Sequence, residues 1–102
     1  MTRKKSYLLK VTNETAALLR GLHPEIKAVM KAALKTIVED PHSGKLLKDE
    51  LKGLRSYRVK RYRIVYRVIE KQKQLEIIAI GPRKNIYEET FRLIRKNIYP
   101  VK

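Results

Sequence analysis

The sequence predicts an α+β fold: an N-terminal strand, an antiparallel helix hairpin, a three-stranded antiparallel meander that completes one sheet, and a C-terminal helix. Three observations predict this class. Residues 13–40 carry apolar side chains at helical spacing in two stretches. Residues 56–80 form three runs rich in Tyr, Val and Ile, as strands do. Residues 86–98 return to helical spacing. With 102 residues, the chain 1–102 is expected to form a single domain.

The first half of the chain is expected to hold one strand and two helices. Residues 7–11 are typical of a short strand, and residues 13–20 are expected to form the first helix. Pro24 suits the first position of a second helix, because the N–H that proline lacks has no helical partner there. Pro41 ends this helix, since the residue before a proline avoids the α region.

The second half is expected to begin with a polar loop at 42–50, followed by strands over 56–60 and 62–70. The apolar positions are odd-numbered before Lys60 and even-numbered from Tyr62 onward. A period of two cannot continue through this change of phase, so a tight turn or bulge is predicted between the two strands.

A further strand is predicted over 75–80, and Gly81-Pro82 ends it. The last helix is predicted over 86–98 and stops before Pro100. Its apolar positions are Ile86, Phe91, Leu93, Ile94 and Ile98.

Positive charge is concentrated on the predicted hairpin. Residues 52–68 hold seven Lys or Arg residues and no acid, in a chain whose formal net charge is +15. The alternation places cations of both strands on one face, where no carboxylate or His is expected, and directs the apolar set to the helices. These cations are Arg58, Lys60, Arg63 and Arg67. A cationic sheet face with tyrosines nearby suits a phosphate backbone and stacked bases, so we expect a nucleic-acid partner.

Several classes of protein do not fit the composition. The chain has no Cys, which excludes a disulfide framework, a thiolate nucleophile and a Cys-based zinc site. Its two His residues are too few for a His-only metal site, and neither metal nor cofactor is expected. No apolar run reaches membrane-spanning length, and no apolar segment follows the basic start as in a secretory signal. The expected location is the cytoplasm.

Two motifs resemble the RelE/ParE superfamily of bacterial and archaeal toxins. They are Leu-Lys-Gly-Leu-Arg-Ser-Tyr-Arg-Val-Lys-Arg-Tyr-Arg-Ile-Val-Tyr-Arg-Val at 51–68 and Ile-Gly-Pro-Arg-Lys-Asn-Ile-Tyr-Glu at 80–88. The resemblance implies the toxin of a type II toxin–antitoxin system. RelE-like members cleave mRNA in the ribosomal A site without a metal, and ParE-like members poison DNA gyrase. The implied partners are a cognate antitoxin protein, the ribosome and mRNA, with no membrane and no small-molecule cofactor.

The resemblance also implies a set of catalytic residues. The paired cations of the second strand correspond to Arg58 and Lys60, the third-strand arginine to Arg63, the arginine after Gly-x to Arg83, and the tyrosine to Tyr87. ParE-like members usually lack part of this set, so the complete set favours an endoribonuclease. Further RNA contacts are expected from Arg55, Arg61, Arg67 and Lys84.

The residue types fit cleavage by the 2′-hydroxyl of the RNA itself. Lys60 is the expected base if neighbouring cations lower its pKa. Arg63 would stabilise the phosphorane, and Arg83 would do the same or assist the leaving group. Tyr87 would stack on a base or orient the 2′-hydroxyl.

Other interpretations stay open at this stage. The same fold would serve a ParE-like gyrase poison, or an inactive RNA-binding or antitoxin-sequestering module. Tyr87 could instead pack the last helix against the sheet. The strand tyrosines are expected to be core or sheet-edge residues rather than base-stacking platforms; they are Tyr57, Tyr62 and Tyr66.

Overall fold

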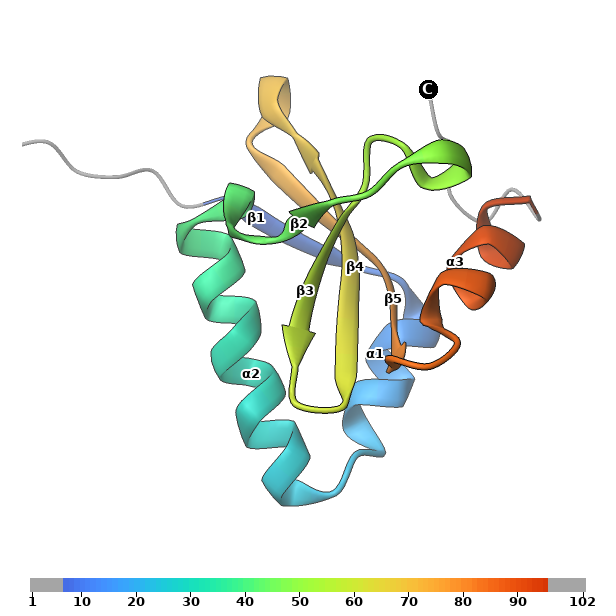
Figure 1. The fold of residues 1–102 in the computed structure, drawn as a ribbon. Coiled ribbons are helices and arrows are strands. Elements are labelled where there is room, and N and C mark those ends of the chain that lie inside the picture. Colours follow the sequence, from blue (N-terminus) through green and yellow to red (C-terminus); the bar gives the residue numbers. More distant parts are fainter. Residues whose placement is uncertain (1–6, 96–102) are drawn as a thin grey trace, which may run out of the picture.

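The computed structural model describes residues 7–95 (Figure 1). In chain order its elements are β1 (Leu8–Val11), α1 (Asn13–Arg20), α2 (Pro24–Glu39), η1 (Pro41–Ser43), β2 (Lys45–Leu46), η2 (Asp49–Leu51), β3 (Arg55–Val59), β4 (Tyr62–Ile69), η3 (Glu70–Gln72), β5 (Gln74–Pro82) and α3 (Ile86–Arg95). The strands form one sheet in the order β1-β5-β4-β3-β2, with β1 parallel to β5 and the other pairs antiparallel. The expected α+β fold is confirmed.

The helices begin where the sequence predicts. The Thr12 hydroxyl accepts the backbone N–H of Thr15 at 3.1 Å and caps α1. His23 Nδ1 accepts the N–H of Glu25 at 3.4 Å, and Pro24 is the first residue of α2.

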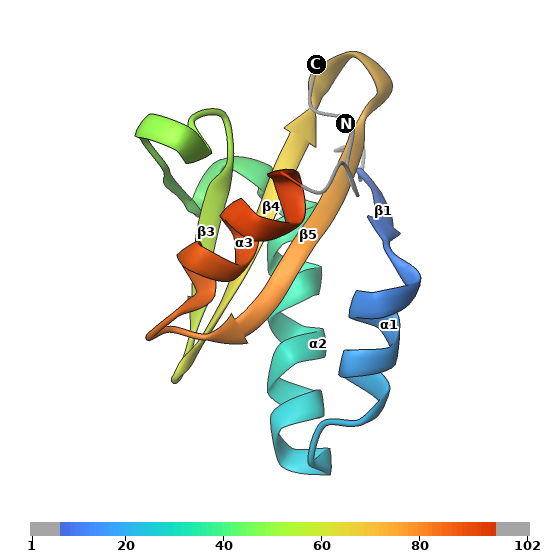
Figure 2. The ribbon, with the colours of Figure 1, turned by 90° about the vertical axis from the view of Figure 1, so that its right-hand side faces the viewer.

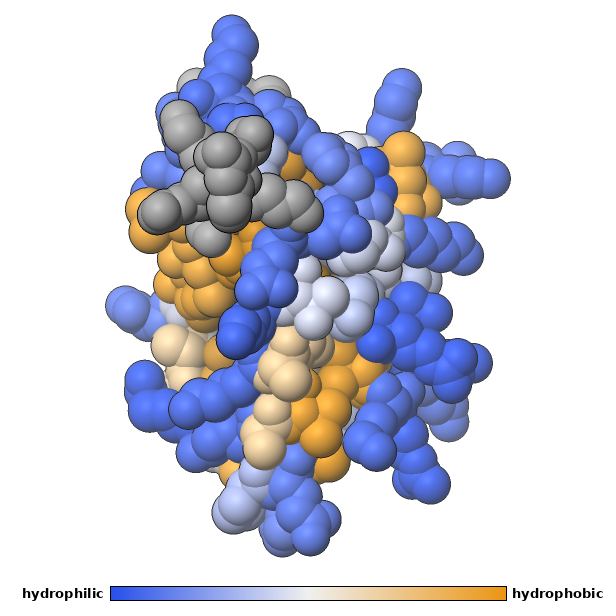
Figure 3. All heavy atoms as spheres, turned by 90° about the vertical axis from the view of Figure 1, so that its left-hand side faces the viewer, coloured by the Kyte–Doolittle hydropathy of each residue, from blue (hydrophilic) through white to orange (hydrophobic). Residues whose placement is uncertain are grey.

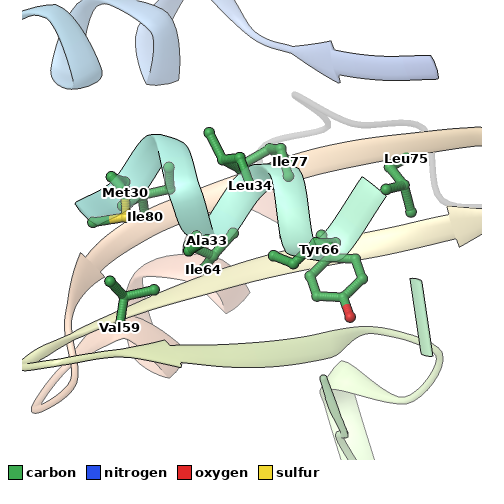
Figure 4. Close-up of a cluster of buried hydrophobic side chains, with 10 residues drawn as sticks. Met30, Ala33, Leu34, Val59, Ile64, Tyr66, Leu75, Ile77 and Ile80 are labelled. Atoms are coloured by element: carbon green, nitrogen blue, oxygen red, sulfur yellow. The ribbon is translucent and has the colours of Figure 1, made fainter. Parts of the chain in front are cut away.

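Both faces of the sheet are covered, by different helices (Figure 2). On one face, α2 packs over the apolar side chains of the sheet (Figure 4). The buried members of this first cluster are Met30, Ala33, Leu34, Ile37, Val59, Ile64, Tyr66, Leu75, Ile77 and Ile80. On the other face lies a second cluster, which includes the start of α3: Leu47, Leu54, Val65, Ile78, Ala79 and Ile86. The apolar alternation of the hairpin therefore faces α2, as predicted.

The turn between β3 and β4 confirms the predicted change of phase. Val59 pairs with Tyr62, which leaves Lys60 and Arg61 as a two-residue turn. A second irregularity lies further along β4, where the register against β5 shifts between Val65 and Tyr66. The extra residue is Ile78 of β5, so the alternation of β5 changes phase there: Leu75 and Ile77 face the first cluster before it, and Ile80 faces that cluster after it.

Several expectations differ from the structure. Gly81 and Pro82 belong to β5 rather than following it, and Lys60 lies in the β3–β4 turn rather than in the predicted strand 56–60.

The segment 42–50 is not only a loop, because β2 pairs with β3 at the sheet edge. Phe91 is 37% exposed, with the guanidinium of Arg95 5.7 Å from its ring centroid, so it is not a core position of α3. The described part of α3 ends at Arg95, and the predicted helix positions 96–98 lie outside the described residues.

Tyr66 fixes the connection between α2 and β2. Its side chain is fully buried, and its hydroxyl donates to the Pro41 carbonyl at 2.7 Å and accepts the Gly44 N–H at 3.0 Å. A Cβ added to Gly44 would lie 2.5 Å from this hydroxyl, so only glycine fits there. Burial raises the pKa of Tyr66. The loop is thereby held against the sheet, and β2 follows directly from it.

We expect Tyr66→Phe to lower the free energy of unfolding by about 1–3 kcal/mol, because two buried backbone groups lose their partner. Urea denaturation of both proteins measures this. Tyr57→Phe, which removes a hydroxyl from the half-buried tyrosine of β3, is the control. Equal stability of Tyr66→Phe and the wild type would contradict the assigned role.

The stability difference should also depend on pH. Since the folded pKa of Tyr66 lies above its unfolded value, its contribution is fully present below about pH 10 and is lost as the pH rises through the folded pKa. The gap between wild type and Tyr66→Phe should therefore shrink above pH 10.

Candidate functional site

One end of the sheet brings together the β3–β4 turn, the end of β5 and the start of α3 (Figures 1 and 2). Tyr62 pairs with Pro82, at the last position of β5. The backbone N–H of Arg83 then donates to the carbonyl of Arg61 at 2.8 Å. This bond holds the segment before α3 against the turn, so residues distant in sequence meet at one tip.

The predicted cations gather at this tip. Arg58 on β3 pairs with Arg63 on β4, and Arg63 pairs with Gly81 on β5. Directly paired residues share a face, so both guanidinium groups lie on the face that carries α3. Exposed cations of the turn and of the segment before α3 complete the group. We name it the tip cluster: Arg58, Lys60, Arg61, Arg63, Arg83 and Lys84.

Hydrogen bonds direct the two paired arginines apart. Arg58 Nε donates to the Lys60 carbonyl at 3.3 Å, toward the turn. Arg63 Nη1 donates to Ser56 Oγ at 3.1 Å, in the other direction along β3. Arg58 is exposed, whereas Arg63 is half-buried. Each guanidinium keeps further N–H donors with which it can bind phosphate oxygens.

Lys60 has a backbone conformation that is costly for its residue type. Its φ is +56°, in the left-handed region, a property it shares with Asp49 and Lys73 among the non-glycine residues of 7–95. For a residue other than glycine, this left-handed conformation lowers the stability of the fold by roughly 1–2 kcal/mol relative to a right-handed one. A lysine rather than a glycine therefore occupies the turn at a cost in stability.

Tyr87 lies in the first turn of α3, next to the tip in sequence. It is half-buried and packs against the second cluster together with Leu51. Its ring therefore contributes to holding α3 on the sheet, the alternative that the sequence left open.

Two predicted RNA contacts lie elsewhere. Arg55 is on the α2 face and donates to the carbonyl oxygens of Gly44 at 2.8 Å and His42 at 3.3 Å. Arg67 lies on the same face as Arg63 but away from the tip, and binds Glu76 at 2.7 Å. The expectation that no carboxylate lies on this face was wrong, because β5 places Glu76 opposite Arg67.

A polar cluster at the other end of the sheet was not predicted from the sequence. Glu70 accepts a hydrogen bond from the Tyr7 hydroxyl at 2.8 Å and lies 2.8 Å from His42 Nε2. The bond from Tyr7 lowers the pKa of Glu70 and raises that of Tyr7. These residues come from three separate segments, so only the tertiary fold reveals their contact.

A second basic surface lies on the α2 side of the molecule, where apolar surface alternates with hydrophilic side chains (Figure 3). Two adjoining hollows there share Lys31 and Leu34. We name them the helix-side groove. Its apolar residues are Leu9, Leu19, Leu34 and Val38, and its charged residues are Arg20, Lys27, Lys31, Lys35 and Glu39.

Within residues 7–95, no three His, Asp or Glu side chains gather closely enough to hold a metal ion. None of the helices in this range is both long and apolar enough to cross a membrane.

The family model described as "ParE-like toxin of type II bacterial toxin-antitoxin system" matches residues 9–90. This chain belongs to that toxin family. The resemblance inferred from the two motifs is thereby confirmed, and the toxin is of the type II toxin–antitoxin class. Among curated proteins, none matches it.

Solved structures share the fold of this toxin. The RelBE2 toxin–antitoxin complex of Mycobacterium tuberculosis contains a chain 28% identical, with a TM-score of 0.68, over 81% of this chain and 98% of that one. A double arginine-to-alanine mutant of E. coli toxin RelE in the free state is 20% identical, with a TM-score of 0.72, over 93% of this chain and 100% of that one. The RelE–RelB complex of Pyrococcus horikoshii OT3 contains a chain 22% identical, with a TM-score of 0.65, over 78% of this chain and 98% of that one.

We expect Lys60→Gly to fold at least as stably as the wild type, because glycine adopts a positive φ without steric cost. Arg61→Gly, at the adjacent turn position, is the matched control and should lose about 0.5–1 kcal/mol. Thermal unfolding of the three proteins measures this, and a lower midpoint for Lys60→Gly than for Arg61→Gly would refute it.

Proposed function

We propose that this toxin is a RelE-like endoribonuclease of the cytoplasm that cleaves mRNA in the ribosomal A site. The observation that supports it best is the tip cluster, in which β3, the β3–β4 turn, β4 and the segment before α3 contribute Arg58, Lys60, Arg63 and Arg83 in that order. Such a concentration of cations suits a phosphodiester whose negative charge grows during reaction.

The proposed reaction uses the RNA's own 2′-hydroxyl as nucleophile. The 2′-oxygen bonds to phosphorus and the bond from phosphorus to the 5′-oxygen breaks, leaving a 2′,3′-cyclic phosphate and a 5′-hydroxyl. Lys60 is the proposed base, because its amine extends from an exposed turn and is a better proton acceptor than a guanidinium. It takes the proton of the attacking hydroxyl.

The arginines are proposed to stabilise charge. Arg63 is half-buried and oriented by Ser56, so it can present its remaining donors to the phosphorane oxygens with little reorganisation. Arg83 is proposed to stabilise the charge on the departing 5′-oxygen, which takes up a proton from solvent water to give the 5′-hydroxyl. Tyr87 is proposed to orient the RNA rather than to exchange protons, since its ring is partly occupied in packing α3.

The proposed partners are a cognate antitoxin, the ribosome and mRNA. Solved relatives include toxin–antitoxin complexes of Mycobacterium tuberculosis and Pyrococcus horikoshii. In this chain, the helix-side groove combines an apolar floor with Lys27, Lys31 and Lys35. An acidic amphipathic segment of the antitoxin would match both properties.

A second candidate is poisoning of DNA gyrase. The family description that matches this chain is ParE-like, which favours this alternative. It needs no RNA chemistry at the tip cluster, so the same variants distinguish the two functions.

We expect Lys60→Ala/Arg83→Ala to reduce ribosome-dependent mRNA cleavage by at least about 100-fold, because a base and a charge-stabilising group are lost together. Mapping of mRNA 5′ ends after brief expression in a translation extract measures this. The matched control is Lys10→Ala/Lys71→Ala, which removes two exposed cations outside the tip cluster.

Cuts that persist in Lys60→Ala/Arg83→Ala would remove both residues from the mechanism. If wild-type toxin makes no cuts while translation continues, the nuclease proposal fails. Gyrase-dependent DNA cleavage by the same preparation would then support the ParE-like function.

We expect Lys31→Glu/Lys35→Glu to weaken binding of the co-purified antitoxin by at least about tenfold, with a smaller deficit at high salt. Titration by calorimetry measures this, with Lys10→Glu/Lys71→Glu as the control of equal charge. Equal losses in both variants would indicate a general charge effect and contradict docking in the groove.

A further inference from the structure

Ser56 is a buried polar residue beside the proposed site. Its side chain is 2% exposed, although it lies on β3 between the half-buried Arg55 and Tyr57. It shares a face with Arg58, two residues further along the strand, and its hydroxyl accepts Nη1–H of Arg63 at 3.1 Å. Ser56 pairs directly with Val65, so Arg63 reaches it diagonally across the two strands.

The diagonal bond matters because Arg58 and Arg63 are direct cross-strand partners. Like charges in that relation repel each other. Arg58 is drawn toward the turn by the Lys60 carbonyl, and Arg63 is drawn the other way by Ser56. Without the hydroxyl, the Arg63 side chain would lose the hydrogen bond that holds it in its observed orientation.

We propose that Ser56 is a positioning residue that orients the Arg63 guanidinium for phosphate. This inference rests on the proposed function of Arg63 in RNA cleavage. The hydroxyl takes one N–H of the guanidinium and leaves the others for the substrate. Because Ser56 is buried, water does not readily replace the lost acceptor when the hydroxyl is removed.

A double-mutant cycle tests whether Ser56 acts through Arg63. Ser56→Ala should lower the single-turnover cleavage rate about tenfold, as expected for loss of a hydrogen bond to a charged group. Ser56→Ala/Arg63→Ala should cleave at the rate of Arg63→Ala alone, within about twofold. A purely structural role would instead lower the rate by the same factor in both backgrounds, and would overturn the proposal.

Thr15→Val is the matched control, since it removes a buried hydroxyl from α1, outside the tip cluster. It should cleave like the wild type, and thermal unfolding should show Ser56→Ala folded at the assay temperature. Loss of cleavage in both variants would also overturn the specific role.

A second measurement keeps the inference separate from the nuclease proposal. The guanidinium NMR signals of Arg63 are assigned by their loss in Arg63→Lys. The guanidinium protons should exchange slowly with water in the wild type and faster in Ser56→Ala. Unchanged signals overturn the inference whether or not RNA is cut. If the Arg63 signals change in Ser56→Ala but the wild type cuts no RNA, Ser56 does position Arg63 and the nuclease function is rejected.

Discussion

The register of β4 against β5 is the constraint on which both the core and the candidate site depend. A shift of one residue would move every side chain of β4 to the opposite face. The bulge beside Tyr66 sends Ile77 to the α2 cluster and Ala79 to the α3 cluster. The same register places Pro82 opposite Tyr62, and so brings Arg83 to the β3–β4 turn.

Stability and charge are distributed unevenly along this sheet. Near β2, the buried Tyr66 hydroxyl satisfies two backbone groups of the preceding loop. At the tip, by contrast, two arginines are direct cross-strand partners, in a relation in which like charges repel each other. Departures from locally favourable structure concentrate at functional sites, because the rest of the fold compensates for them. Since Lys73 at the other end of the sheet also has a positive φ, the pairing of like charges, rather than backbone strain, distinguishes the tip as the proposed site.

The sequence predicted what local patterns determine and missed what tertiary contacts determine. The change of phase at Lys60 located the turn, and Pro24 located the start of α2, because both signals lie within a few residues. The bulge in β5 was not predicted, since the apolar run 77–80 has no alternation that a bulge could interrupt. β2 was missed because it depends on the contact between Gly44 and Tyr66. The contact of Arg67 with RNA was expected because its ion-pair partner Glu76 lies on a different strand, and the local sequence around Arg67 does not reveal that pairing.

The two basic surfaces lie on opposite faces of the sheet, and this separation limits how an antitoxin can inhibit the toxin. The helix-side groove is lined by α1, α2 and β1, whereas Arg58 and Arg63 lie on the face that carries α3. A segment bound in the groove therefore cannot contact these arginines through the sheet. It must either continue around an edge of the sheet to reach the tip or exclude a large substrate by its bulk. Under the proposed function, exclusion by bulk suits a target the size of a ribosome, and neutralising the groove cations would also weaken the electrostatic attraction between toxin and rRNA.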